Sequence, residues 1–161
     1  MCDCFVGGWS VSIANILNPS KGGLLCAIDL LPIEPIAHAH FIQGDFNDDS
    51  VKKKLLAYSN GRLIDVIVSD MLQNTSGVKS DDHYRSISLC LNALYFSETN
   101  VINGGTFLCK FLRGSDDNEL INAAKELYED VKVIKPKASR SESNEIYMLA
   151  TKRKVNKVDP V

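Results

Sequence analysis

The chain has 161 residues, a hydrophobic content of 45% and a formal net charge of −2. Its length suits one globular domain with a core of its own, and its ordinary charged content of 24% argues against an intrinsically disordered protein. No apolar run reaches the roughly 18 residues that a membrane-spanning helix requires, so the sequence predicts no transmembrane segment.

Basic residues are concentrated toward the carboxyl end. Residues 130–161 contain eight lysines and arginines against four acids, which gives this segment a charge of +4 and the remainder a charge of −6. Such a segment can meet a phosphate backbone, which favours an RNA partner, but an ordinary solvated surface gives the same pattern. Residues 152–161 are interpreted as a basic tail that follows a single domain over residues 1–151.

Cysteine and histidine usage indicates neither a disulfide framework nor a metal centre. The five cysteines include no CxxC pair, and Cys26 and Cys109 lie in apolar runs, where a thiol behaves as a small hydrophobe. This usage is typical of a reducing, intracellular compartment. His38 and His40 could share one face of a strand, but no third ligand is near, so no metal is expected. The first ten residues contain no secretion signal and no arginine-rich transit peptide.

Short apolar runs of strand type alternate with segments of helical periodicity along the chain. In chain order the patterns predict a helix over 8–17, strands over 24–28 and 39–42, a helix over 50–58, a strand over 63–68, a helix from 80, a strand over 106–112, a helix from 115, and strands over 131–134 and 145–150. The alternation predicts a doubly wound, Rossmann-like α/β fold with a mostly parallel sheet. Because no helical pattern separates the last two strands, they are expected to be antiparallel neighbours.

Three details of these elements are specific expectations. The unbroken run Val66-Ile67-Val68 predicts a strand that is covered on both faces. Asn103-Gly104-Gly105 predicts a turn that leads into the following strand. In the helix over 50–58, Val51, Leu55 and Tyr58 are expected to face the core.

Acidic residues close three of the predicted strands. Asp29, Asp45 and Asp70 each follow an apolar run, and ligands of doubly wound folds bind beyond the carboxyl ends of such strands. Gly7-Gly8 opens a predicted helix about 20 residues before Asp29, the separation at which Rossmann-like domains bind ribose hydroxyls. A full GxGxxG is absent, and an aspartate that caps a turn explains Asp29 as well as a ribose ligand does.

Lys110 is the most unusual of the polar residues. It lies inside the apolar run Leu108–Leu112, and an ammonium group is costly to bury unless it is paired. Asp70 ends one strand and Glu145 opens the antiparallel last strand, so both carboxylates are expected at the same edge of the sheet. The three side chains can form a purely structural ion-pair cluster, or they can serve a reaction in which Lys110 accepts a proton from a hydroxyl. Their spacing leaves both interpretations open.

Several stretches of the chain together resemble the FtsJ/RrmJ-type ribose 2′-O-methyltransferases. They lie between Gly7 and Thr151 and read GGWS, AIDLLPIEP, FIQGDF, IVSDMLQNTSG, GGTFLCKF and KPKASRSESNEIYMLAT. The last block and the Ser69-Asp70-Met71 block are the most specific, and both are similar to the branch that acts on the large ribosomal subunit. ISLCL and GGTFLCK are most similar to eukaryotic mitochondrial members.

The resemblance implies a methyltransferase that uses S-adenosylmethionine, and it implies a set of cofactor-binding residues. Gly7 and Trp9 match the cofactor loop, Asp29 the acid near the cofactor ribose, and Asp45 the acid near the adenine amino group. Asp70 matches a residue that serves both the cofactor pocket and the catalytic site. Family members usually carry a longer loop, DxGAAPGGWS, and the loop of this chain is two residues shorter.

The resemblance also implies the reaction. Lys110 matches the proton acceptor, Glu145 its companion acid and Asp70 a third catalytic residue. A ribose 2′-oxygen, expected to belong to a uridine of large-subunit ribosomal RNA, attacks the methyl group of the cofactor in line. The target nucleotide has to be splayed out to reach the site, and the basic carboxyl-terminal third is expected to face the RNA. A monomer in the mitochondrion, without metal and without membrane contact, is expected on the same basis.

Two alternatives stay open. Family members carry a further catalytic lysine on a helix before the first strand, and this chain starts after that point, so an amino-terminally truncated form is expected. A relative that binds RNA without catalysing methyl transfer is therefore the first alternative. The second is another nucleotide-binding α/β enzyme, such as a nicotinamide-dependent oxidoreductase, which fits Asp29 but gives Lys110 and Glu145 no role.

Overall fold

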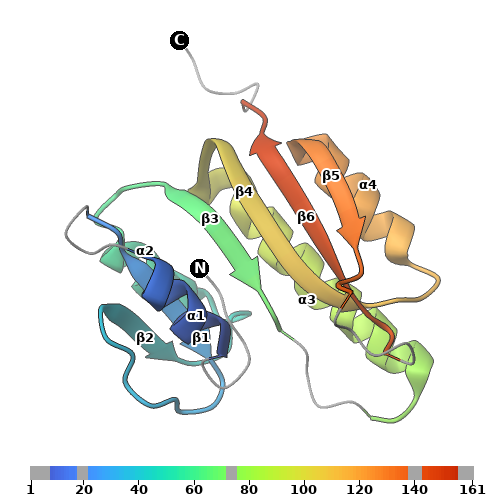
Figure 1. Ribbon diagram of the computed structural model, residues 1–161, viewed down its shortest axis with the longest axis horizontal. Helices are drawn as coiled ribbons and strands as arrows, with labels where there is room; N and C mark the ends of the chain where they lie inside the picture. The colour runs from blue at the N-terminus through green and yellow to red at the C-terminus, as the bar shows by residue number, and fades with distance from the viewer. Residues whose placement is uncertain (1–7, 18–21, 72–75, 138–142, 156–161) are drawn as a thin grey trace. The chain divides into compact units, whose positions relative to one another are not determined.

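The computed structural model describes residues 8–17, 22–71, 76–137 and 143–155 (Figure 1). The chain divides into two compact units, Met1–Leu63 and Ile64–Val161, and each has a sheet of its own. Within the described ranges, no helix combines the length and the apolar character needed to cross a membrane.

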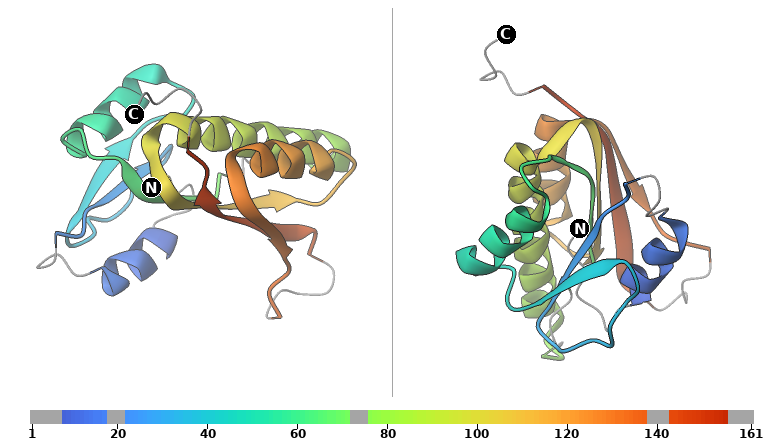
Figure 2. Two further views of the ribbon diagram at one scale, coloured as in Figure 1. Left: turned by 90° about the horizontal axis from the view of Figure 1, so that it is seen from above. Right: turned by 90° about the vertical axis from the view of Figure 1, so that its left-hand side faces the viewer.

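The first unit holds a two-stranded parallel sheet between two helices. Its elements are α1 (Gly8–Ile16), β1 (Leu25–Asp29), β2 (Ala39–Gln43) and α2 (Asp49–Tyr58). The two strands pair in parallel, so that Asp29 lies opposite Gln43 at their carboxyl ends. The helices lie on opposite faces of this sheet (Figure 2). Every residue of β1 is buried, as expected for an apolar strand that is covered on both faces.

Helix α2 begins at an aspartate cap and packs two apolar residues inward. The Asp48 side chain accepts a hydrogen bond from the backbone amide of Ser50 over 2.7 Å. Val51 and Leu55 are buried, as predicted. The prediction for Tyr58 was wrong, because this side chain is 41% exposed and stacks on His40 of β2, with ring centroids 4.4 Å apart. Tyr58 is the last residue of the helix and packs against β2 rather than into the core.

The second unit is a four-stranded sheet with two helices. Its elements are β3 (Ile64–Ser69), α3 (Lys79–Asn100), β4 (Val101–Leu112), α4 (Asp117–Leu127), β5 (Tyr128–Ile134) and β6 (Glu145–Arg153). The strand order is β3-β4-β6-β5, in which β3 and β4 are parallel and β6 is antiparallel to both of its neighbours. The predicted antiparallel pairing of the last two strands is therefore confirmed, as is the mixed α/β class.

The core of this unit lies between the sheet and its two helices. Figure 2 shows α3 and α4 on the same side of the sheet. Alternate residues of β4, namely Phe107, Cys109 and Phe111, are fully buried. Helix α3 adds Cys90 and Leu94, which are also fully buried. The side chains between these positions of β4 therefore leave the opposite face of the sheet.

Strand β3 is less covered than its sequence suggests. Ile67 and Val68 are buried, whereas Val66 is 38% exposed. The prediction of cover on both faces was wrong for Val66, because β3 forms an edge of the four-stranded sheet.

The glycine pair before the main apolar run lies inside a strand. Helix α3 continues directly into β4, so Asn103-Gly104-Gly105 does not form a turn before the strand, and that prediction was wrong. The pairing with β3 shifts register between Val101 and Thr106, and Gly104 has a φ of +80° within the shift. Glycine therefore serves a bulge at this position, where a residue with a side chain would be strained.

Candidate active site

Lys110 lies near the carboxyl end of β4. Its neighbours Cys109 and Phe111 are buried in the helix-covered core, so the lysine side chain leaves the other face of the sheet. Only 10% of this side chain is exposed. A buried ammonium group needs anionic partners, because the loss of its hydration is costly.

Two carboxylates supply these partners. The Lys110 Nζ lies 2.5 Å from Oδ1 of Asp70 and 3.6 Å from Oε1 of Glu145. The Asp70 side chain is 4% exposed and the Glu145 side chain 40% exposed, so the first contact is buried and the second opens to solvent. The structure thus brings together the three residues that the sequence predicted to meet. We call them the Lys110 cluster.

Strand directions explain why these residues meet. Strand β3 ends at Ser69, which pairs with Cys109, so Asp70 follows just where Lys110 stands on the neighbouring parallel strand. Strand β6 runs antiparallel to β4, and its first residue, Glu145, lies opposite Leu112. The end of a parallel strand and the start of an antiparallel one therefore deliver carboxylates to one edge of the sheet.

The cluster controls the protonation of its lysine. Burial lowers the pKa of Lys110, but the hydrogen bond and charge of Asp70, together with the charge of Glu145, outweigh it and leave the pKa above its ordinary value. The lysine is therefore an ammonium at neutral pH. This state suits a structural ion pair, and it also suits a site where a cation faces a developing negative charge.

Tyr147 borders the cluster, and the sequence analysis gave it no role. It lies directly opposite Lys110 in the pairing of β4 with β6. Burial raises the pKa of its phenol; the Lys110 charge lowers that pKa, and the Asp70 and Glu145 charges raise it. The spacing of two residues after Glu145 in an antiparallel strand is the signal that would have indicated it, because both side chains then share one face.

Ser69, which precedes Asp70, was also missed. Its side chain is fully buried, and its hydroxyl has no hydrogen-bond partner among the residues that the structure describes. Buried hydroxyl groups nearly always have a partner, so this oxygen is available to a ligand at the end of β3. A serine at the last position of an apolar parallel strand is the sequence signal.

The predicted cofactor residues Asp29 and Asp45 belong to the first unit. Asp29 is 6% exposed at the end of β1, and its Oδ1 accepts a hydrogen bond from the amide of Leu31 over 2.9 Å. Asp45 is exposed two residues beyond β2, and its Oδ1 accepts a hydrogen bond from the amide of Asn47 over 2.8 Å. Both acids thus stand at the carboxyl edge of the β1–β2 sheet, where ligands of such folds bind.

The remaining cofactor residues lie at the start of the chain. Trp9 is half-buried in the first turn of α1, whereas Gly7 lies outside the described residues. The carboxylates of Asp29 and Asp45 fit a nucleoside. In each, Oδ1 accepts a backbone hydrogen bond within its own turn, and the second oxygen can accept from a hydroxyl or an amino group. In the second unit, the buried Ser69 hydroxyl has no hydrogen-bond partner among the described residues and can meet a polar ligand group.

The basic residues at the end of β6 are engaged in the fold. Lys152 Nζ lies 2.7 Å from Oδ2 of Asp130. Arg153 is 6% exposed, and it donates a hydrogen bond to Oδ1 of Asn103 over 2.8 Å. Because β6 starts at the Lys110 cluster and runs away from it, these charges lie at the other edge of the sheet. Within the described part of the chain, no group of three histidines, cysteines or acids is placed to hold a metal ion.

Comparison with known proteins identifies the family. The sequence profile of the FtsJ-like methyltransferases matches residues 2–153. The chain belongs to the FtsJ-like methyltransferase family. It is 40% identical, over 92% of its length and 71% of the relative's, to the ribosomal RNA large subunit methyltransferase E of Francisella tularensis subsp. novicida. The predicted family is therefore confirmed, and the nicotinamide-dependent oxidoreductase is replaced by a methyltransferase.

Solved structures agree with this assignment. A Plasmodium falciparum protein described as a ribosomal RNA methyltransferase is 30% identical and has a TM-score of 0.80, over 94% of this chain and 85% of that one. A Streptococcus mutans protein described as a methyltransferase, solved with S-adenosylhomocysteine, has a TM-score of 0.56 at 13% identity, over 94% of this chain and 84% of that one. The Rossmann-like methyltransferase fold is thus confirmed, and S-adenosylmethionine is the methyl donor at the level of the family.

The buried ion pair makes a prediction about stability. Replacing Lys110 with methionine removes the cation from a carboxylate that is only 4% exposed, so we expect the free energy of unfolding to fall by about 3–5 kcal/mol. The double variant D70N/K110M removes both charges and should recover most of this loss. Urea denaturation of the two variants and the parent measures both effects. A K110M variant as stable as the parent would mean that Asp70 is solvated in solution.

Proposed function

We propose that this protein transfers a methyl group from S-adenosylmethionine to a ribose 2′-hydroxyl of large-subunit ribosomal RNA. The observation that carries the proposal is the Lys110 cluster, in which a buried amine stands between two carboxylates at the ligand-binding edge of the sheet. The name of the Francisella relative supports the large ribosomal subunit as the substrate. A uridine as the target, a mitochondrial location and a monomeric state are further parts of the proposal, and they are supported by the sequence resemblance alone.

The family resemblance suggests which residues contact which part of the cofactor. The carboxylate of Asp29 would bind the cofactor ribose, and Asp45 would bind the adenine amino group. In the second unit, Ser69 and Asp70 would contact the amino-acid end of the cofactor. When bound, S-adenosylmethionine supplies an electrophilic methyl group, whose bond to sulfur breaks as a bond to the ribose oxygen forms.

The Lys110 cluster would then act on the ribose hydroxyl. Asp70 holds the amine in one position by a 2.5 Å contact, and Glu145 restrains it from the solvent side. In its neutral form Lys110 accepts the hydroxyl proton as the oxygen attacks, and it becomes an ammonium beside two anions. Fixing the amine in this way contributes to the rate, because the attacking oxygen must be aligned with the methyl group.

The proposed role of Lys110 predicts a specific loss of activity. In K110M we expect the rate of methyl transfer to fall by about 10²–10⁴-fold, because no proton acceptor remains beside the hydroxyl. The substrate would be large ribosomal subunits from bacteria that lack their own methyltransferase E, and the product would be measured as ribose-methylated nucleotide by mass spectrometry. The affinity for S-adenosylmethionine, measured by calorimetry, should be retained. Undiminished turnover in K110M would refute the role, and a parent protein that binds the RNA without methylating it would favour the non-catalytic alternative.

The raised pKa of Lys110 predicts how the rate depends on pH. Because the pKa lies above its ordinary value, only a small fraction of the amine is neutral near neutral pH. This fraction grows about tenfold with each pH unit below the pKa, so kcat should rise about tenfold per unit between about pH 7 and 9. The measurement is single-turnover methyl transfer over this range. A flat profile would contradict proton acceptance and would indicate that the ammonium form acts on the oxygen.

The proposed ribose contact predicts an effect of Asp29 on the cofactor alone. In D29N the amide oxygen can still accept the hydrogen bond from Leu31, but the group that binds the hydroxyls loses its charge. We expect S-adenosylmethionine to bind about 10- to 100-fold more weakly, since hydrogen bonds to charged groups contribute about 1.5–3 kcal/mol. Asp49 is an exposed acid of the same unit, and D49N is the matched control, which should bind normally. Equal affinities of D29N and D49N would rule out the ribose contact.

A further inference from the structure

Beyond the end of β3, the last residues of β4 have no neighbouring strand on the β3 side. The pairing of β3 with β4 ends at Ser69 and Cys109, while β4 continues through Lys110 to Leu112. On its other side, β4 stays paired with β6 up to Leu112. In the described part of the chain, no strand takes the place of β3 beside these last residues. Their main-chain groups on this side still need hydrogen-bond partners, because buried backbone groups are rarely left unpaired.

Helix α3 supplies these partners through three side chains. Cys90 Sγ donates to the carbonyl oxygen of Lys110 over 3.3 Å. Ser86 Oγ accepts a hydrogen bond from the amide of Leu112 over 2.9 Å, and His83 Nδ1 lies 2.7 Å from the carbonyl oxygen of the same residue. The three side chains are three and four residues apart in sequence, so they lie on one face of the helix. Each of them is at least nine-tenths buried.

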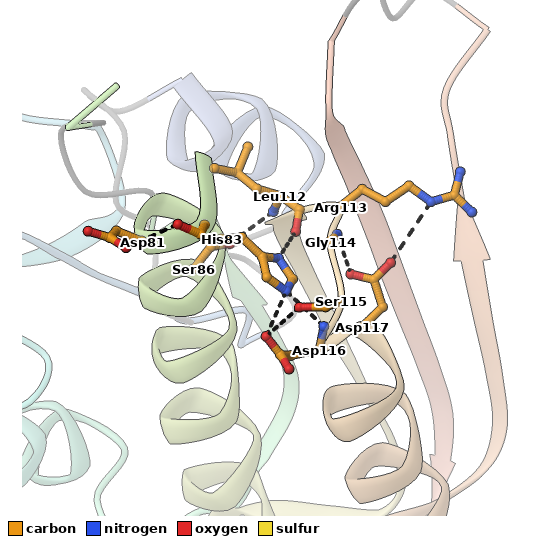
Figure 3. Close-up of polar contacts among 10 residues, drawn as sticks. Asp81, His83, Ser86, Leu112, Arg113, Gly114, Ser115, Asp116 and Asp117 are labelled. Carbon is orange, nitrogen blue, oxygen red and sulfur yellow. Dashed lines mark hydrogen bonds and ion pairs between the residues drawn. The ribbon is translucent and has the colours of Figure 1, made fainter. Parts of the chain in front are cut away.

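The contacts of His83 place a proton on Nδ1. The carbonyl oxygen of Leu112 can only accept a hydrogen bond, so Nδ1 donates to it. On the other side of the ring, the backbone nitrogen of Asp116 lies 3.0 Å and its Oδ2 lies 3.3 Å from Nε2. Figure 3 shows the imidazole between the Leu112 carbonyl and the turn that follows β4. A Cβ atom on Gly114 would overlap the ring, so the turn is closely packed on the histidine.

We propose that His83, Ser86 and Cys90 are positioning residues for methyl transfer, which take the place of the missing strand and hold Lys110 in register with Asp70 and Glu145. Strand β3 must end for the chain to leave the sheet at Asp70, whose carboxylate contacts the Lys110 amine. Because β3 ends there, the last residues of β4 lose their main-chain hydrogen bonds to β3, and the position of Lys110 would be less constrained if nothing replaced these bonds. The polar face of α3 resolves this conflict, because it binds the main chain at Lys110 and Leu112 while their side chains keep the opposite face of the sheet for the reaction. This inference rests on the proposed function.

Helix α3 itself provides a matched control. Ser97 follows Cys90 by seven residues, so it lies on the same face of the helix and is likewise buried. Its hydroxyl donates to the Leu94 carbonyl and accepts from the hydroxyl of Tyr128 over 2.9 Å, and among the described residues it has no hydrogen bond to β4. S97A therefore removes a buried serine hydroxyl from the same helix without touching the strand that carries Lys110.

The test compares S86A, H83A and H83N with S97A in the full chain, below the melting temperature of each variant. We expect kcat for methyl transfer to fall on the order of 10- to 100-fold in S86A and H83A, because displacing a reacting group by up to about 1 Å has effects of this size. The KM for S-adenosylmethionine should not change. H83N should recover part of the loss, since the asparagine amide can donate where Nδ1 does. S97A should keep the parent kcat, whatever its stability.

A second measurement does not depend on turnover. In protein with isotopically labelled lysine, an NMR titration of the Lys110 amine should give a lower pKa in S86A and H83A than in the parent and S97A, because its carboxylates would be held less closely. The Leu112 amide should also exchange faster with solvent. If the parent transfers no methyl group, the proposed function fails while these two measurements still test the positioning. If the parent is active and S86A and H83A have the same kcat as S97A, the proposal is overturned. If the parent is inactive, the proposal is overturned when S86A and H83A match S97A in both the Lys110 pKa and the Leu112 amide exchange. Should S86A not fold, S86C, which keeps a weak acceptor, replaces it with the same expectations.

Discussion

The contact between the Lys110 amine and the Asp70 carboxylate constrains most of the second unit. Both side chains are nearly buried, so burying either charge without the other would be costly. The 2.5 Å contact also requires that the two groups lie within a narrow range of positions. Strand β3 therefore has to end opposite Cys109, and β4 has to continue beyond it. Glu145 can join the pair only because β6 runs in the opposite direction and starts at this edge. The sheet is thus arranged around a charge that an apolar strand would otherwise exclude.

The two faces of this sheet carry different kinds of side chain. The face under α3 and α4 carries the aromatic and sulfur-containing side chains of β4 and supplies stability. The opposite face carries Lys110, Glu145 and Tyr147; the Glu145 charge raises the pKa of Lys110, and the charges of both residues shift the pKa of Tyr147. Helix α3 lies on the first of these faces, and its buried polar residues bind the main chain of β4 from the core side. His83, Ser86 and Cys90 can be buried on a core helix because they form hydrogen bonds with main-chain groups of β4 that would otherwise have no partner.

The charged residues at the two ends of β6 have different partners. Glu145 starts the strand at the cluster, whereas Lys152 and Arg153 end it at the other edge, where they pair with Asp130 and Asn103. A count of basic residues over the carboxyl-terminal third treats these charges alike. Glu145 and the basic pair lie far apart, because β6 is nine residues long and its two ends lie at opposite ends of the strands of the sheet. The two ends of β6 therefore differ in what their charged residues contact within the fold.

The sequence by itself determined the order of helices and strands, the antiparallel last pair and the meeting of Lys110 with Asp70 and Glu145. These features depend on local periodicity and on one strong energetic rule, that a lysine within an apolar strand must be paired. The family followed from motifs that are contiguous in the chain. The tertiary structure decided what depends on neighbours distant in sequence: the exposure of Val66 on an edge strand, the glycine bulge inside β4 and the outward position of Tyr58. It also decided the contacts of His83, Ser86 and Cys90. Helical spacing places them on one face, but only the early end of β3 gives their polar atoms main-chain partners to bind.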